Sequence, residues 1–202
     1  MRVAIIGGGA AGFFSAFSVK EHHPNSEVTI FEKSNKLLSK VKVSGGGRCN
    51  VTNACFSPSK LSKSYPRGGK HLKKAFSVFQ AKDTVEWFSR RGVELKAEED
   101  GRMFPTTDNS QTIIDCFLKE AVQKNIKILE QSPIRKIVPE KEGYILHLER
   151  TSKHFDKVII ATGGSPKLSG FYWLQQLGHS ISSPIPSLFT FNIPGDQVKI
   201  LM

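Results

Sequence analysis

Three glycines near the start of the chain have the spacing that a dinucleotide-binding turn requires. Residues 2–12 read RVAIIGGGAAG, in which Gly7, Gly9 and Gly12 follow the G-x-G-x-x-G pattern, and Glu32 comes twenty residues after Gly12. In such a turn the first glycine permits the bend, the second lets the backbone approach a pyrophosphate, and the third lets helix and strand pack closely. A carboxylate at the distance of Glu32 can accept hydrogen bonds from a ribose. The pattern therefore predicts a dinucleotide site and leaves NAD and FAD both open.

The turn lies between the elements that must position it. Residues 2–6 predict a strand, residues 10–22 a helix, and residues 27–32 a second strand that ends on the acid. A helix that begins near Ala10 directs unpaired backbone N–H groups at a bound phosphate. Because this strand–turn–helix context is complete, a glycine-rich turn that binds nothing is the weaker interpretation.

A second glycine cluster, SGGGRCNVTN at residues 44–53, is typical of a different kind of binding loop. Consecutive glycines expose backbone N–H groups and allow positive φ, as a loop that holds an anion or a flat ring needs. Arg48 offers a rigid fork of donors, and Asn50, Thr52 and Asn53 offer hydrogen bonds without charge. The alternative is a flexible hinge, which would not need Arg-Cys-Asn directly after its glycines.

The three cysteines, Cys49, Cys55 and Cys116, indicate neither a disulfide framework nor the paired spacing of a zinc site. Cys49 follows Arg48, whose positive charge we expect to lower the pKa of the thiol. Because Cys49 has no CxxC partner, a structural role in the loop is favoured over a redox role. The tyrosines and histidines form no constellation, so no catalytic residue and no metal site are predicted.

A third motif is DKVIIATGG at residues 156–164. A buried strand that ends in Ala-Thr-Gly-Gly brings the backbone close to something large at the carboxyl end of a sheet. Taken alone, the motif also fits a strand followed by an ordinary loop.

Helical and strand patterns alternate between these motifs. Residues 33–67 have weak periodicity, which predicts a long functional loop. Glu142-Gly143 predicts a hairpin turn. We expect helices at about 69–80, 82–91, 110–124 and 168–177, and strands at about 93–95, 102–104, 126–129, 133–138, 143–149 and 154–160.

The composition of the 202 residues is that of a globular protein of one or two domains, with a formal net charge of +11. No apolar run reaches the ~20 residues of a membrane span, and the N-terminus does not resemble a signal peptide, so we expect a cytoplasmic protein without a membrane partner. Much of the basic excess lies between Lys33 and Lys74, which fits either a polyanion-binding surface or a solvated basic face. Because few aromatic residues are interleaved and no nucleic-acid module motif is present, we favour the solvated face and expect no nucleic-acid partner.

Together the motifs resemble the two-dinucleotide-binding-domain flavoproteins, such as the glutathione-reductase and succinate-dehydrogenase groups. The SGGGRCNVTN segment is similar to that of the BaiN-type bacterial FAD-dependent oxidoreductases, also called HI0933-like or YhiN-like flavoproteins. Gly101 to Pro105 and residues 178–188 also resemble segments of this family. The resemblance implies an α/β, Rossmann-like FAD-binding domain with a mainly parallel central sheet, helices on both faces and a small antiparallel β-meander.

The resemblance also implies where FAD would lie. Its pyrophosphate would lie over residues 7–12, its adenosine ribose on Glu32, and its flavin side along residues 40–52, with Lys42 pointing to solvent. Ile134 or Arg135 would pass the adenine, and residues 161–164 would close over the cofactor. The implied cofactor-binding residues are Gly7, Gly9, Ala10, Ala11, Gly12, Glu32, Lys33, Lys40, Ser44, Gly45, Gly46, Gly47, Arg48, Cys49, Asn50, Thr52, Ile134, Ala161, Thr162, Gly163 and Gly164.

Family members are roughly twice as long as this chain, so the resemblance implies an N-terminal half. Residues 1–188 would form the FAD-binding domain, with a helical insertion at about 56–110 and the meander at about 126–156. Residues 189–202 would begin a truncated substrate-side domain.

The implied activity is hydride transfer through flavin N5 to or from an electron-poor small molecule, such as an enone or a steroid-like compound, with NAD(P)H as the reductant. The alternatives are an FAD-dependent tRNA-modifying enzyme and a non-catalytic FAD-binding fragment. The oligomeric state is not predicted.

Overall fold

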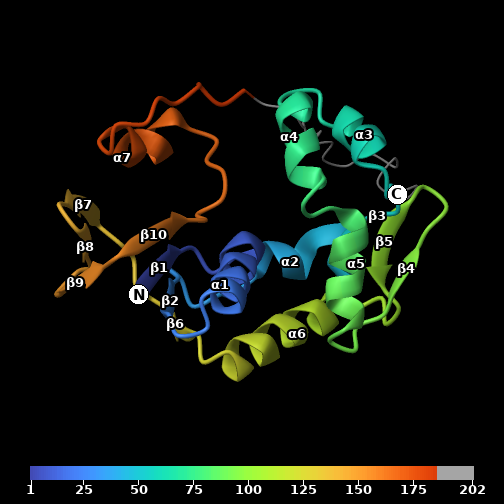
Figure 1. Ribbon diagram of the computed structural model, residues 1–202, viewed down its shortest axis with the longest axis horizontal. Coiled ribbons are helices and arrows are strands. Elements are labelled where there is room, and N and C mark those ends of the chain that lie inside the picture. Colours follow the sequence, from blue (N-terminus) through green and yellow to red (C-terminus); the bar gives the residue numbers. More distant parts are fainter. Residues whose placement is uncertain (186–202) are drawn as a thin grey trace, which may run out of the picture. The chain divides into compact units, whose positions relative to one another are not determined.

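The computed structural model describes residues 1–185, in which residues 1–162 form one compact unit and residues 163–185 belong to a second. The first unit is built on a four-stranded parallel sheet with the strand order β10-β1-β2-β6 (Figure 1). These strands are β1 (Arg2–Ile6), β2 (Glu27–Phe31), β6 (Lys127–Leu129) and β10 (Lys157–Ile160). The sheet is the mainly parallel one that the sequence predicts.

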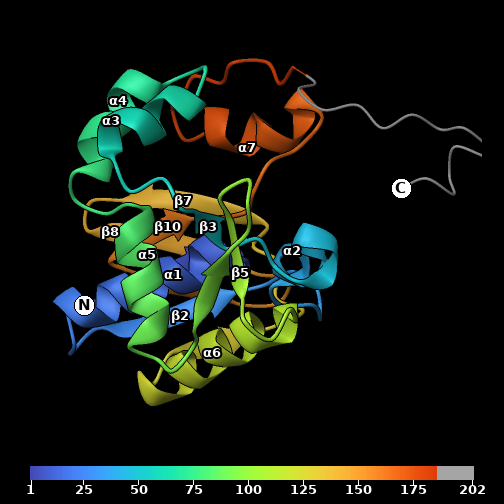
Figure 2. The same cartoon turned by 90° about the vertical axis from the view of Figure 1, so that its right-hand side faces the viewer.

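Helices lie on one face of this sheet. Helix α1 (Ala10–His22) follows β1, and α6 (Ser110–Gln123) lies beside α1 and precedes β6 (Figures 1 and 2). Residues from both sides meet in one buried cluster, in which Val3, Ile5, Val28 and Ile30 of the sheet join aromatic and aliphatic residues of the two helices. Apolar runs such as β1 are typical of parallel strands that are covered on both faces.

The second face of the sheet contacts an antiparallel meander, where we expected helices on both faces. The meander consists of β7 (Lys136–Glu140), β8 (Gly143–His147) and β9 (Ser152–Phe155). The ring of Phe155 packs edge-on against Phe31 of β2 with centroids 5.6 Å apart. The predicted hairpin turn at Glu142-Gly143 is confirmed, since Glu140 pairs with Gly143 and Gly143 has a φ of 98°.

The predicted strand at 154–160 is wrong in one respect, because it is two strands in two different sheets. Asp156 separates β9 from β10 and exchanges hydrogen bonds with Arg2: its N–H donates to the Arg2 carbonyl, and its carboxylate accepts from the Arg2 N–H. A polar residue at this position lets the chain leave the meander and join the parallel sheet.

A second antiparallel sheet and four helices lie between β2 and α6. The sheet has the order β3-β5-β4, with β3 (Thr52–Asn53), β4 (Leu95–Ala97) and β5 (Arg102–Pro105). The loop expected at 33–67 contains α2 (Ser39–Val43), α3 (Pro58–Leu61) and two 3-10 turns, Ser44–Gly47 and Ser62–Ser64. The predicted helices at 69–80 and 82–91 are the shorter α4 (Gly69–Phe76) and α5 (Ala81–Ser89).

The described part of the second unit contains a 3-10 turn, Leu168–Phe171, and α7 (Tyr172–Gln175), where we expected one helix over 168–177. Gly178, with a φ of 88°, follows as the expected stop. The expected domain boundary at 188 and the segment 189–202 lie outside the described residues. Within residues 1–185, no helix combines the length and the apolar composition that crossing a membrane requires.

Candidate cofactor site

The glycine turn lies at the carboxyl end of β1, where two of its three glycines are needed by the protein itself. Gly7 donates its N–H to the Phe31 carbonyl at 2.8 Å and has a φ of 120°, and a Cβ on it would lie 2.3 Å from the Ala161 carbonyl oxygen. A Cβ on Gly12 would lie 1.9 Å from the Gly7 carbonyl oxygen. Both positions therefore exclude any side chain, as the fingerprint predicts.

Gly9 is different, because nothing in the protein requires a glycine there. Its φ of −92° is open to any residue, and a Cβ on it would have no atom within 4 Å. Helix α1 begins directly after it, with no side-chain cap and no acidic residue in its first turn. The exposed Ala10 and Ala11 complete this turn. The space beside Gly9 is open, and the N–H groups at the start of α1 have no side-chain cap. A pyrophosphate could therefore bind there.

Glu32 directly follows β2, beside this turn, and is held in place by two backbone donors and one hydroxyl. Its carboxylate accepts hydrogen bonds from the N–H of Gly8 at 2.9 Å and from the N–H and hydroxyl of Ser34, both at 2.8 Å. Partial burial acts to raise the pKa of Glu32, but the hydrogen bonds from Ser34 and Gly8 outweigh it and lower that pKa. The acid is therefore a fixed carboxylate next to the glycine turn, as a ribose ligand must be.

The chain after β6 returns to Glu32. The N–H of Ser132 donates to the Glu32 carbonyl at 2.8 Å, and the N–H of Gln131 donates to the Ser34 carbonyl at 3.0 Å. Ile134 follows two residues later and is half-buried, while Lys33 is exposed. The segment that the resemblance assigns to the adenine therefore lies beside the assigned ribose ligand.

The strand end at Ala161 forms the remaining wall of the turn. The Ala161 N–H donates to the Ile6 carbonyl at 2.8 Å, and Ala161 and Thr162 are the backbone that excludes a side chain from Gly7. Gly163 and Gly164 belong to the second unit, so this wall is described only as far as Thr162. The structure thus brings together residues 7–12, Glu32, Ala161 and Thr162, and Ile134 lies two residues after Ser132, which bonds Glu32.

The second glycine cluster forms a tight turn after α2. Gly45, Gly46 and Gly47 all have positive φ, at 57°, 68° and 88°, which explains three glycines in succession. A Cβ on Gly45 would also lie 2.6 Å from the Phe104 ring, whereas Gly46 and Gly47 have no atom within 4 Å of such a Cβ. Gly46 and Gly47 therefore leave open backbone that a ligand can approach.

The other expected residues of this segment have mixed environments. Lys40 and Asn50 are exposed, and the Ser44 hydroxyl donates to the Val41 carbonyl at 2.9 Å. Thr52 begins β3, where it pairs with Met103. Lys42 is exposed, as predicted, and its carbonyl accepts the Ser110 hydroxyl of α6 at 2.9 Å.

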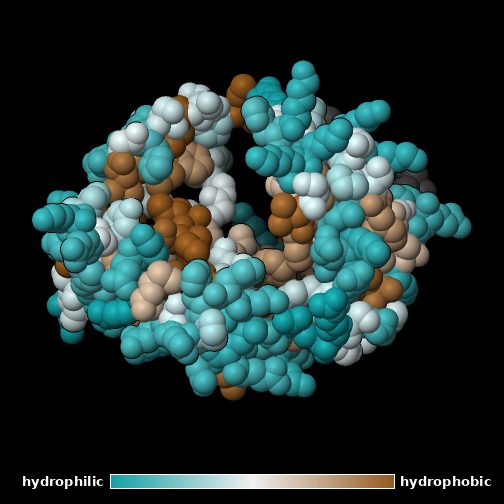
Figure 3. All heavy atoms as spheres, viewed as in Figure 1, coloured by the Kyte–Doolittle hydropathy of each residue, from teal (hydrophilic) through white to brown (hydrophobic). Residues whose placement is uncertain are grey.

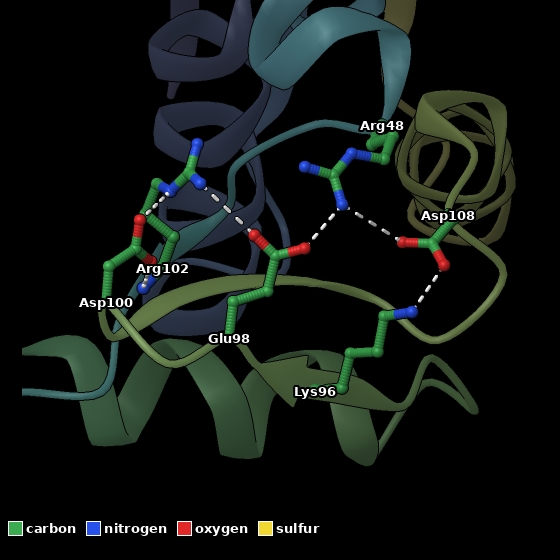
Figure 4. Close-up of polar contacts among 6 residues, drawn as sticks. All are labelled: Arg48, Lys96, Glu98, Asp100, Arg102 and Asp108. Carbon is green, nitrogen blue, oxygen red and sulfur yellow. Dashed lines mark hydrogen bonds and ion pairs between the residues drawn. The ribbon is translucent and has the colours of Figure 1, made fainter.

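Arg48 is bound by acids of the protein, where we expected its donors to face a cofactor. Its guanidinium forms a hydrogen bond with Glu98 and lies 3.6 Å from the Asp108 carboxylate (Figure 4). It also stacks 4.0 Å from the centroid of the buried Phe104 ring. The hydrogen bond to Glu98 is the main reason that the pKa of Arg48 is raised. Arg48 therefore ties the glycine loop to the β4–β5 hairpin.

The partners in this network were not predicted from the sequence. Lys96 pairs with Asp108, and Arg102 pairs with both Asp100 and Glu98 (Figure 4). Glu98 lies fifty residues from Arg48, so no local spacing indicates the pair. The GRMFP segment, which contains Arg102 and Phe104, resembles a family segment, but that resemblance did not indicate that it lies beside the loop.

The expectation for the Cys49 thiol is wrong. Cys49 is 5% exposed and packs in the main hydrophobic cluster with a φ of 65°. Burial raises its pKa, and the neighbouring guanidinium is already neutralised by Glu98. Cys49 is therefore a structural residue of the loop.

The described cysteines are all free, and residues 1–185 contain no group of three or more side chains suited to a metal ion.

One protein family matches all of the residues that the structure describes. Residues 1–185 match the family model described as the HI0933-like protein Rossmann domain. The chain belongs to this family. The family predicted from the glycine turn and the SGGGRCNVTN segment is thereby confirmed.

Curated relatives of the HI0933-like chain are named as enzymes. It is 25% identical over 198 residues to the 3-dehydro-bile acid delta(4,6)-reductase of Clostridium scindens, covering 95% of this chain and 47% of the relative. The chain is 29% identical over 160 residues to the ribosomal RNA dihydrouridine synthase of Escherichia coli, covering 79% of this chain and 38% of the relative. A protein of that name from Haemophilus influenzae is 28% identical over 197 residues, covering 93% and 48%. The chain spans about half, or less, of the length of these relatives.

Solved structures confirm the Rossmann-type fold. THI4 of Thermovibrio ammonificans superimposes with a TM-score of 0.57 at 13% identity, covering 87% of this chain and 62% of that one. The FrdA chain of Escherichia coli quinol fumarate reductase gives 0.58 at 14% identity, covering 82% and 33%.

Proposed function

We propose that this HI0933-like chain is the FAD-binding part of an oxidoreductase that reduces a carbon–carbon double bond conjugated to a carbonyl group. The observation that carries the proposal is the turn at Gly9, which is open toward solvent although the protein does not need a glycine there. Glu32 lies beside this turn as a fixed carboxylate. A dinucleotide needs both features.

The chain's own residues have separable roles in holding the cofactor. Gly7 to Gly12 would bind the pyrophosphate through backbone N–H groups, and Glu32 would accept hydrogen bonds from the ribose. Residues 44–52 would line the flavin side, with Gly46 and Gly47 as open backbone, and Arg48 would hold this loop in place. When bound, FAD supplies hydride transfer through N5 of its flavin ring.

The names of the relatives support the choice of electron acceptor. Both names point to a carbon–carbon double bond conjugated to a carbonyl group: one next to the 3-oxo group of a steroid, the other the C5=C6 bond of uridine. Such alkenes accept a hydride at the carbon β to the carbonyl and a proton at the α carbon. We propose NAD(P)H as the reductant, bound outside this glycine turn.

A second candidate differs in the substrate, which would be a uridine base in RNA. The two relatives named as ribosomal RNA dihydrouridine synthases support it at 28–29% identity, against 25% for the bile acid reductase. The net charge of +11 also favours an anionic partner. We therefore propose the RNA substrate as the alternative to a small-molecule enone.

Flavin spectroscopy tests the proposed function. The purified chain is reconstituted with FAD, freed of unbound flavin and treated anaerobically with NADH or NADPH. We expect retained flavin bands that bleach with the reductant and return on adding a 3-oxo-Δ4 steroid or a uridine-containing RNA. A chain that retains no flavin, or a reduced flavin that neither acceptor reoxidises, would contradict the proposal.

A further inference from the structure

The excess of positive over negative charge in the chain comes from one segment. Residues 33–82, which we call the basic segment, contain twelve lysines and arginines and no aspartate or glutamate. The rest of the chain has 17 basic against 18 acidic residues, so it is nearly neutral. The twelve are Lys33, Lys36, Lys40, Lys42, Arg48, Lys60, Lys63, Arg67, Lys70, Lys73, Lys74 and Lys82.

The charge is densest on the helical insertion formed by α3, the 3-10 turn Ser62–Ser64 and α4. Six cations lie there, all exposed, and none takes part in an ion pair among the described residues. Figure 3 shows hydrophilic residues gathered over α3 and α4. The six cations are Lys60, Lys63, Arg67, Lys70, Lys73 and Lys74.

Helix α4 lacks the acids that normally accompany lysines on a solvated helix. Lys70 lies three and four residues before Lys73 and Lys74, a spacing at which like charges repel and destabilise a helix. In the neighbouring α5, by contrast, Glu86 pairs with Lys82 at 3.7 Å and with Arg90 at 3.6 Å. A bound polyanion would supply the negative charge that α4 lacks.

Exposed aromatic side chains lie within the insertion and directly before and after it in the sequence. Phe56, Tyr65 and Phe79 are 46%, 44% and 39% exposed, although the sequence alone indicated few interleaved aromatics. Flat exposed rings beside lysines are typical of surfaces that bind unpaired nucleic-acid bases. A membrane-binding helix would instead present a broad apolar face, whereas Leu72 and Phe76 of α4 are half-buried.

The insertion has a defined internal structure, and the chain directly after α4 contacts the helix that begins at the cofactor turn. A Cβ on Gly69 would lie 2.3 Å from the Ser62 carbonyl oxygen, so α4 packs directly on the preceding turn. The Phe79 ring contacts Phe14 of α1 with centroids 5.2 Å apart. Phosphates bound on the insertion would thus be connected to the helix whose start we assign to the dinucleotide.

We propose that the α3–α4 insertion is a docking surface for unpaired RNA, with its lysines and Arg67 on phosphates and its exposed rings on bases. The choice of RNA over other polyanions rests on the second candidate function, in which the substrate is a uridine base in RNA. The docking surface itself requires no bound flavin.

The test measures binding of a fluorescent single-stranded RNA to the full chain over a range of salt concentrations. In the test variant Lys70, Lys73 and Lys74 are all changed to Gln. In the matched control Lys119, Lys141 and Lys157, which are exposed and outside the basic segment, are changed to Gln. Both variants lose three positive charges, and thermal unfolding followed by circular dichroism reports whether each keeps its fold.

We expect the test variant to bind RNA about tenfold more weakly or worse, and its salt slope to fall by about 2, since each phosphate contact on a single strand contributes ~0.7. The control should bind like the unmodified chain. Equal losses in both variants, no RNA binding at low salt, equal affinity for duplex DNA, or binding to anionic phospholipid vesicles in place of RNA would each overturn the proposal. FAD retention, measured on the same samples, separates failure of the docking surface from failure of the proposed function.

Discussion

Individual residues of the glycine turn differ in what they do, although the sequence pattern treats them alike. Gly7 and Gly12 are required by contacts within the protein, whereas Gly9 is not. The turn itself could be predicted from the spacing of the three glycines, because its geometry depends on residues that are adjacent in the sequence. The roles of Arg48 and Cys49 were not predictable, because Glu98, Asp108 and Phe104 come from distant parts of the chain.

Glu32 predicts a pH dependence of stability. Its pKa is lowered in the folded protein, so its contribution is fully present above the unfolded value of about 4.3 and is lost as the pH falls through the folded value. We expect the free energy of unfolding to fall less steeply between about pH 6 and about pH 3 in Glu32→Gln than in the unmodified chain. Urea titrations over this range measure it, and parallel curves for the two proteins would contradict the prediction.

At the scale of elements, the Arg48 network predicts how the glycine loop is held. Removing the charge of Glu98 in Glu98→Gln weakens the one side-chain hydrogen bond that the Arg48 guanidinium forms among the described residues. We expect faster hydrogen exchange in residues 44–50 and unchanged exchange in the parallel sheet. Mass spectrometry of the exchanged peptides measures this.

Glu140→Gln serves as the control for the loop experiment, because Glu140 is exposed and forms no ion pair among the described residues. If both variants exchange alike in residues 44–50, the ion pair does not position the loop.

Helices α1, α5 and α6 share one aromatic cluster, which predicts where stability is concentrated. The Phe117 ring lies 5.4–6.1 Å, centroid to centroid, from the rings of Phe13, Phe17, Trp87 and Phe88. We expect Phe117→Ala to lower the free energy of unfolding by about 3–5 kcal/mol. The matched variant Val122→Ala, on the exposed side of the same helix at 76% exposure, should change it by about 0.5 kcal/mol or less. Denaturant unfolding compares them, and similar losses would rule out this cluster as the centre of the core.

The sequence predicted the order of elements better than their ends. Helices α1 and α6 lie where the sequence placed them: α1 follows the glycine turn, and the buried stripe of α6 is set by local spacing. The single strand predicted at 154–160 is two strands because Asp156 bonds Arg2, which lies 154 residues away. Such a contact leaves no trace in the local pattern.

At the scale of the whole molecule, the chain combines two features that the family comparison does not connect. One is the open glycine turn of the Rossmann-type unit, and the other is the helical insertion of the same unit, on which six exposed cations lie. We propose that the first holds FAD and the second holds the partner. The chain spans about half, or less, of the length of its curated relatives. The reaction and the substrate that we assign to it are therefore proposals.

The central claim is that the Gly9 turn binds the pyrophosphate of FAD, and a titration with FAD of the unmodified chain and of Gly9→Asp tests it most directly. Aspartate is a favoured residue at a helix start, so the variant should unfold no more easily than the parent. The same carboxylate would repel and obstruct a pyrophosphate. We predict that the unmodified chain binds FAD and that Gly9→Asp binds it about a hundredfold more weakly, a loss of about 2.7 kcal/mol. Equal affinities of the two proteins, or no FAD binding by the unmodified chain, would contradict the account.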